Sequence, residues 1–210
     1  MKPVTLLPAT YVPRGRVDLS KNRGLLLGLS LGSLALFLVF GLLFLSAAVI
    51  LVPHLPSSGR LALDIPRLLA ILVGALAISV LVAVLHELTH AVFFWLFTHE
   101  WPVFGFKGVY AYTAAPKWYI PRLPFLVVGL APLLLLTLLG LALLHTLPLG
   151  LIPAVLFALT INAAGAIGDL YLMFRLLFTP AACLIRDEGN SVTWYVPEEA
   201  GRSLEKSLEQ

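Results

Sequence analysis

Charged residues are scarce in this sequence. Lys, Arg, Asp and Glu make up 12% of its 210 residues, whereas a soluble domain carries roughly 25%. Hydrophobic residues reach 60%, and the mean hydropathy is +0.96. This composition excludes an ordinary soluble domain and indicates an integral membrane protein. Cys183 is the only cysteine, which excludes an intrachain disulfide. The net charge of +3 is not gathered into a basic patch, so we expect no nucleic-acid partner.

Long apolar runs dominate the chain instead. They lie at about residues 24–52, 68–97, 123–147 and 149–178. Each exceeds the roughly 20 residues that a helix needs to cross about 30 Å of hydrocarbon. The first run is also too long for the apolar region of a cleavable signal peptide. We therefore predict an all-α membrane protein with four transmembrane helices.

Polar segments flank this transmembrane region. We predict an N-terminal tail (1–23), a transmembrane domain (24–178) and a C-terminal hairpin with a charged tail (179–210). Two segments are rich in β-prone residues around a turn: 103–113, with a Lys-Gly turn, and 183–196, with an Asp-Glu-Gly-Asn turn. The sequence thus predicts short cytosolic β-hairpins beside the helices.

The distribution of lysine and arginine predicts the orientation. Of the 14 such residues, only Arg60 and Arg67 lie in the loop between the first two apolar runs. All others lie on the side of the membrane that holds both termini. Because cytosolic segments carry the excess of positive charge, we expect both termini in the cytosol.

The second apolar run contains the motif His86-Glu87-Leu88-Thr89-His90. Two histidines four residues apart share one face of a helix, and the glutamate between them is placed to act on a metal-bound water. A carboxylate in hydrocarbon costs about several kcal/mol, which makes it a functional residue by default. Motif and location together predict a membrane-embedded zinc hydrolase and favour a protease.

Asp169 is the other acidic residue within the four runs. His90 lies about eight residues, and Asp169 about nine, before the cytosolic end of its run. At about 1.5 Å per residue, both are expected roughly 12–14 Å below the cytosolic surface. Charge bias and hydropathy therefore place the motif and Asp169 at one level.

A hydrolytic zinc site takes three protein ligands and leaves a fourth position for water. The place of a third histidine in the extended form of the motif is occupied by Leu96, and Glu100 falls in the next loop. This leaves Asp169 as the predicted third ligand, beside His86 and His90. Glu87 is the predicted catalytic base, which takes a proton from the zinc-bound water and returns it to the leaving amine.

Asn162 lies seven residues before Asp169, so on a continuous helix the two would share a face. Two interpretations are open: Asn162 acts on the substrate or the tetrahedral oxyanion, or it makes a hydrogen bond between helices. The small residues Gly165, Ala166 and Gly168 are expected to let the second helix approach closely.

At these positions the chain resembles the site-2-protease-type intramembrane metalloproteases. Those enzymes place His-Glu-x-x-His in one transmembrane helix and an aspartate ligand in a later one. Two details differ: Gly168-Asp169 reverses their Asp-Gly order, and no proline follows Asn162. The wider pattern, including Leu130-Ala131-Pro132, is similar to a small prokaryotic family of zincin peptidases of unknown function. The resemblance covers roughly residues 65–197 and implies peptide-bond hydrolysis, without a substrate.

The favoured function is a zinc-dependent endopeptidase that cuts membrane or membrane-proximal substrates near the cytosolic face. The expected partners are the lipid bilayer and a membrane protein or peptide substrate, and the expected location is a prokaryotic cell membrane crossed several times. Two alternatives stay open, a metal transporter or sensor and a non-catalytic scaffold. Charged groups at a single depth disfavour a transport path, and Glu87 disfavours a purely structural metal site.

Residues 103–113 carry a further hypothesis. A protease holds its substrate extended, and an exposed strand edge does so through main-chain hydrogen bonds. This hairpin either presents such an edge near the metal or is simply a packed interfacial hairpin.

Overall fold

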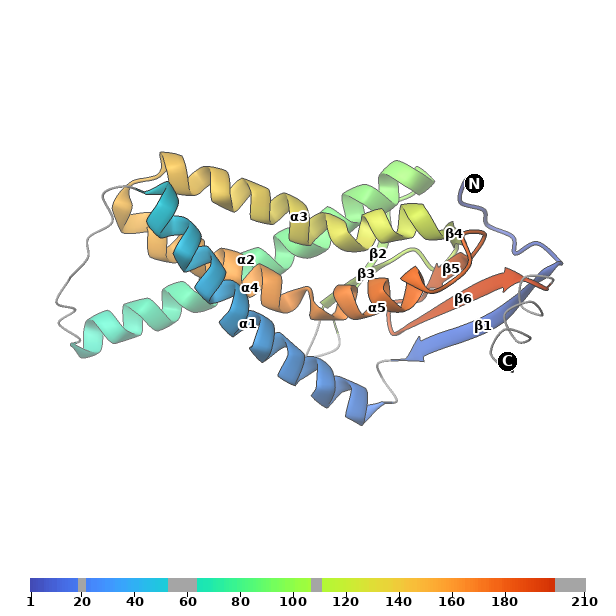
Figure 1. The fold of residues 1–210 in the computed structure, drawn as a ribbon, viewed down its shortest axis with the longest axis horizontal. Helices are drawn as coiled ribbons and strands as arrows, with labels where there is room; N and C mark the ends of the chain where they lie inside the picture. The colour runs from blue at the N-terminus through green and yellow to red at the C-terminus, as the bar shows by residue number, and fades with distance from the viewer. Residues whose placement is uncertain (19–21, 53–63, 107–110, 199–210) are drawn as a thin grey trace. The chain divides into compact units, whose positions relative to one another are not determined.

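The computed structural model describes residues 1–18, 22–52, 64–106 and 111–198 (Figure 1). The predicted turn at 107–110 and the charged tail at 199–210 lie outside these residues. The chain divides into two compact units, each built from segments far apart in the sequence. The sheet unit comprises Met1–Gly28, Glu87–Ala131 and Gly168–Gln210, and the helical unit comprises Leu29–His86 and Pro132–Ile167.

Within the described part of the chain, three helices are long and apolar enough to cross a membrane. They are α1 (Arg23–Leu51), α2 (Ile65–Thr98) and α3 (Arg122–Thr146). They confirm the first three predicted apolar runs as helices. Side-chain oxygens cap two of them: Asn22 Oδ1 accepts the N–H of Leu25, and Asp64 Oδ1 accepts the N–H of Arg67, both at 2.9 Å.

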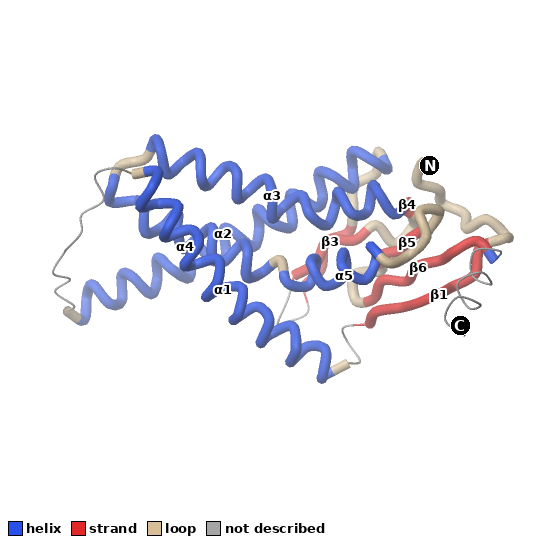
Figure 2. The backbone as a smooth tube through the Cα atoms, in the orientation of Figure 1, coloured by secondary structure: helices blue, strands red, loops and turns tan. Residues whose placement is uncertain are grey.

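The fourth predicted run forms three pieces rather than one helix. The 3₁₀ turn η1 (Leu149–Leu151) leads into α4 (Ile152–Gly165), and α5 (Ile167–Leu177) follows after Ala166 (Figure 2). The segments Leu149–Gly165 and Ile167–Leu177 are long and apolar enough to cross a membrane only when they are counted together as one broken span. A total of four spans therefore stays a prediction, as does the cytosolic placement of both termini.

The break at Ala166 corrects two expectations. Asn162 lies on α4 and Asp169 in the first turn of α5, so they do not share the face of one helix. A methyl group added at Gly165 or Gly168 would meet no described atom within 4 Å, so these glycines do not mediate close packing. Glycine is about 1 kcal/mol less favourable than alanine in a helix, which favours an interruption between them.

The sheet unit contains a four-stranded antiparallel sheet. Its strands, in spatial order, are β1 (Tyr11–Asp18), β6 (Ser191–Pro197), β5 (Leu184–Asp187) and β4 (Ile120–Pro121). Strands β5 and β6 confirm the predicted hairpin within 183–196. Strand β1 was not anticipated, because the segment was expected to be part of a tail; Figure 1 shows it, in blue, beside the red β6. Its register shifts between Pro13 and Gly15, and the Trp194 ring packs so close to Gly15 that it leaves no room for a Cβ there.

A second sheet of two strands lies in the same unit. Strands β2 (Val103–Phe106) and β3 (Ala111–Ala114) pair antiparallel, which confirms the hairpin predicted for 103–113. Val103, Phe104 and Phe106 on β2 are exposed, whereas Thr113 and Ala114 on β3 are buried. The β3 end of the hairpin therefore packs into the unit.

The core of the sheet unit joins helices to the sheet. Its buried side chains come from α2, α3, α5 and the strands, and include Phe94, Phe125, Met173, Leu176, Ile185 and Trp194. Burying one such side chain contributes about 1.5–3 kcal/mol. In the helical unit a separate core contains Phe44, Ala48, Leu144, Ile152, Leu159 and Ala163.

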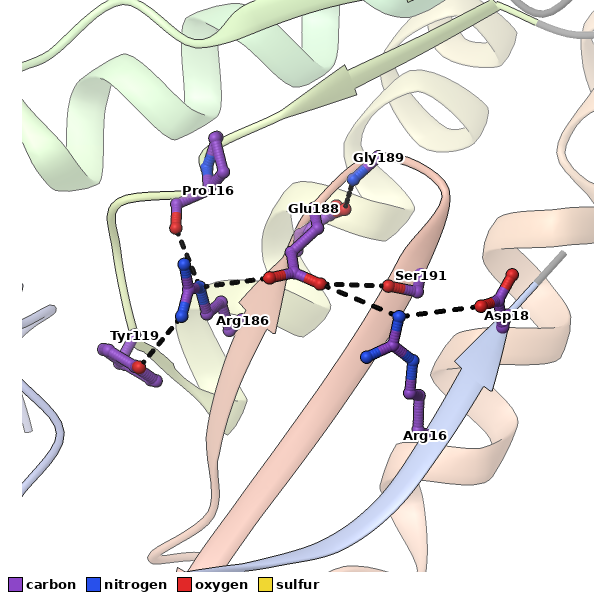
Figure 3. Close-up of polar contacts among 9 residues, drawn as sticks. Arg16, Asp18, Pro116, Tyr119, Arg186, Glu188, Gly189 and Ser191 are labelled. Atoms are coloured by element: carbon purple, nitrogen blue, oxygen red, sulfur yellow. Dashed lines mark hydrogen bonds and ion pairs between the residues drawn. The ribbon is translucent and has the colours of Figure 1, made fainter. Parts of the chain in front are cut away.

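A polar network ties β1 to the β5–β6 hairpin (Figure 3). The Arg186 guanidinium donates to the Pro116 carbonyl at 2.9 Å and to the Tyr119 hydroxyl at 3.2 Å. It also pairs with Glu188, which in turn lies 3.9 Å from the Arg16 guanidinium. The N-terminal strand is thus held by side chains as well as by backbone pairing.

Candidate metal centre

Helix α2 carries His86, Glu87 and His90 in one uninterrupted stretch. His86 is the last residue of the helical unit in this segment, and Glu87 and His90 belong to the sheet unit. The two histidines are 8% and 7% exposed, although neighbouring leucines on α2 are largely exposed. The helix therefore turns both histidines inward, together with Ala91 and Phe94, and exposes leucines such as Leu85 and Leu88 on other faces.

His90 is held from two sides within the sheet unit. Its Nε2 lies 3.5 Å from Asp169 Oδ1, and its Nδ1 lies 2.9 Å from the Val128 carbonyl oxygen. A carbonyl only accepts hydrogen bonds, so Nδ1 carries the hydrogen and donates it. The nitrogen directed at the Asp169 carboxylate is then Nε2, the atom suited to bind a metal.

His86 has a comparable arrangement within the helical unit. Its Nδ1 lies 3.0 Å from Asn162 Oδ1, and Asn162 Nδ2 donates to the Pro132 carbonyl at 3.3 Å. Asn162 is 2% exposed, and both ends of its amide are engaged. This geometry supports the hydrogen-bond interpretation of Asn162; a role on the substrate stays a prediction.

Glu87 lies beside β3 in the sheet unit. Thr113 Oγ1 donates to Glu87 Oε2 at 2.8 Å and lies 3.1 Å from the Glu87 carbonyl oxygen. The sequence predicts the hairpin but not the contact of this threonine with Glu87. The pattern of β-prone residues does not fix which β3 side chain faces α2, so it held no signal for Thr113.

Asp187 is a second residue that the sequence patterns do not predict for this site. It ends β5, and its Oδ1 accepts the Gly189 N–H at 2.8 Å. Burial raises the pKa of Asp187 to about 7, against the lowering effects of the Gly189 hydrogen bond and of His90. Asp169 and Glu87 raise the pKa further by like-charge repulsion. Asp187 is therefore electrostatically coupled to the polar residues of α2 and α5.

The residues present suit a zinc ion. Within the sheet unit the structure brings Asp169 to His90, and within the helical unit it joins His86 to Asn162. Imidazole nitrogen and carboxylate oxygen are ligands that zinc takes in hydrolytic sites. Each histidine also donates its Nδ1–H to an acceptor oxygen, as metal-binding histidines usually do with the ring nitrogen that does not bind the metal.

Comparison with known proteins gives one finding. The family model described as "Putative zincin peptidase" matches residues 79–184, about half of the chain, and this range includes the whole motif and Asp169. No curated protein and no solved structure matches the chain. With its histidine motif buried on α2 and an aspartate beside His90, the chain belongs to this zincin peptidase family.

Proposed function

We propose that this chain is a membrane-embedded zinc endopeptidase whose metal ligands are His86, His90 and Asp169. The observation that carries the proposal is the contact of the Asp169 carboxylate with His90 Nε2 at 3.5 Å. The aspartate comes from a helix some 80 positions along the chain, and it meets the motif at the nitrogen that a metal requires. Membership of a zincin family independently implies zinc.

His86 is expected to complete the ligand set. It lies one helical turn before His90 on the same face of α2. Its Nδ1 is engaged by Asn162, so Nε2 is the ring nitrogen that would hold a metal, as the Val128 contact implies for His90. Two imidazoles and a carboxylate give the three-ligand set of a catalytic zinc site.

Glu87 is proposed to move the proton in the reaction. A bound zinc ion supplies a Lewis acid that brings the pKa of water to near 7. Glu87 accepts the proton of the attacking water and delivers it to the amine of the departing peptide. The hydroxyl of Thr113 holds the Glu87 carboxylate in position for both transfers.

The membrane setting supports a membrane or membrane-proximal substrate. Three long apolar helices indicate membrane association, and a multi-pass location in a prokaryotic cell membrane is part of the proposal. Strand β2 pairs only with β3 among the described strands, so its outer edge suits an extended peptide. Because β3 contacts Glu87 through Thr113, a peptide on this hairpin would lie close to the motif.

Glu87→Gln tests the proposal in detergent-purified protein. We expect about one zinc per chain in both wild type and variant by elemental analysis, because Glu87 is not a ligand. Cleavage of a reconstituted mixture of tagged transmembrane peptides should fall by about 10²-fold or more, the range for loss of a catalytic base. His145→Ala is a matched control. His145 is exposed, lies in the last turn of α3 and is not part of the histidine motif on α2.

Other outcomes distinguish the alternatives. Wild type purified without zinc would contradict the enzyme and favour a scaffold. Zinc binding without cleavage, combined with zinc flux into vesicles that Glu87→Gln leaves intact, would favour a transporter. Retained cleavage by Glu87→Gln would remove Glu87 from its role.

A further inference from the structure

Helix α3 contains a proline in its interior, Pro132. In an α-helix, the N–H of residue 132 would donate to the carbonyl of Val128, four residues earlier. Proline has no N–H, so this hydrogen bond cannot form. The Val128 carbonyl instead accepts the hydrogen bond from His90 Nδ1 at 2.9 Å. The proline therefore leaves to His90 an acceptor that a regular helix would have used itself.

The carbonyl of Pro132 serves the other histidine. It accepts a hydrogen bond from Asn162 Nδ2 at 3.3 Å, and Asn162 Oδ1 lies 3.0 Å from His86 Nδ1. Asn162 is 2% exposed, so water does not readily replace these contacts. Backbone carbonyls of α3, those of Val128 and Pro132, thus reach both histidines of the motif, and only the Val128 contact depends on residue 132 being proline.

We propose that Pro132 is a positioning residue that orients the metal-binding His90 by leaving the Val128 carbonyl to accept the hydrogen bond from Nδ1. The inference rests on the proposed zinc site and adds what fixes its His90 ring. An N–H at position 132 would compete with His90 for the Val128 carbonyl. His90 would then lose the contact that selects its Nδ1–H tautomer and directs Nε2 at Asp169. If Pro132 served only to bend α3, its role would not depend on the absence of an N–H that competes with His90.

Pro132→Ala and Pro132→Gly test this role, because both restore the N–H while they differ strongly in helix propensity. We measure zinc affinity of the full chain in detergent by competition with a chelator. We expect it to fall about tenfold or more in both variants, the range seen for residues that orient metal ligands. The thermal midpoint of the zinc-free alanine variant should equal or exceed that of wild type, because alanine favours the helix.

Pro124→Ala is the matched control. Pro124 lies in the first turn of the same helix, where a backbone N–H has no helical partner, so zinc affinity should not change. Wild-type affinity in either folded Pro132 variant would overturn the inference. So would an affinity loss shared by Pro124→Ala, or one that appears only in variants with a lowered zinc-free midpoint. Absence of zinc binding by wild type would overturn the proposed function itself, and the inference with it.

Discussion

Thr113 donates a hydrogen bond from its Oγ1 to the Glu87 carboxylate at 2.8 Å. The contact joins β3 to α2, and Thr113 is only 6% exposed. A glutamate side chain has three rotatable bonds, and ordering it costs conformational entropy. A buried donor from the hairpin fixes the carboxylate before the substrate arrives, which places the proposed base in a defined position.

Removing this hydroxyl should slow the reaction without removing the metal. In Thr113→Val the side chain keeps its shape but loses the donor. We expect cleavage of the peptide mixture to fall about tenfold, the order for one hydrogen bond to a charged group, with zinc content unchanged. Thr113→Ser keeps the hydroxyl and should retain most activity. Equal activity in all three proteins would show that the hydrogen bond does not position Glu87.

The ligand set gives a second prediction. His86→Ala, His90→Ala and Asp169→Ala should each lose bound zinc, because each removes one of three proposed ligands. His145→Ala should keep about one zinc per chain. Elemental analysis of the purified proteins measures both. Zinc lost from the histidine variants but kept in Asp169→Ala would leave the motif intact and remove Asp169 as the third ligand.

The sequence was informative wherever a local pattern determines the structure of a segment. Three apolar runs became α1, α2 and α3, because length and hydropathy alone decide such helices. The motif on α2 needed no tertiary information, since residues at i and i+4 share a helical face. Asp169 is predicted as the third ligand by exclusion, because it is the only acidic residue besides Glu87 in an apolar run.

The features that sequence missed depend on contacts between distant segments. The pairing of β1 with β6 follows from packing, which single-sequence patterns do not contain. Thr113 reaches Glu87 because of its position on β3, and Val128 contacts His90 through its backbone carbonyl rather than its side chain. Pro132 was visible as a motif residue, but its effect needed the partner of the Val128 carbonyl to be known.

The raised pKa of Asp187 predicts that the stability of the zinc-free protein depends on pH. Burial and the neighbouring Asp169 and Glu87 raise its pKa to about 7, while Gly189 and His90 oppose the shift. A carboxyl whose pKa is raised by folding binds its proton more tightly in the folded state. Its contribution to stability is therefore present below pH about 4, the unfolded pKa, and is lost as the pH rises to about 7.

Asp187→Asn should remove this dependence. We expect the thermal midpoint of chelator-treated wild type to fall from pH 5 to pH 8 more steeply than that of the variant. Asparagine keeps an oxygen that accepts the Gly189 N–H, so the turn should persist. Differential scanning fluorimetry in detergent measures both curves. Parallel curves would mean that Asp187 does not change its charge on folding in this range.

Substitution of Asn162 distinguishes the two interpretations of its role. If it orients His86, Asn162→Leu should lower zinc affinity by about 10–100-fold, the range for partners of metal-binding histidines. If it acts on the oxyanion, zinc affinity should stay the same, and the cleavage rate at saturating zinc should fall by about 10²–10³-fold. The contact with His86 at 3.0 Å leads us to expect the loss of affinity.

Thr160→Val provides the matched control for this measurement. Thr160 is another buried polar residue of α4, but its hydroxyl donates to the Leu156 carbonyl of its own helix. Its removal should leave zinc affinity unchanged, so a loss confined to Asn162→Leu cannot come from general damage to α4. Unchanged affinity in a folded Asn162→Leu protein would separate Asn162 from His86. The amide would then have to act on the substrate, as the other interpretation holds.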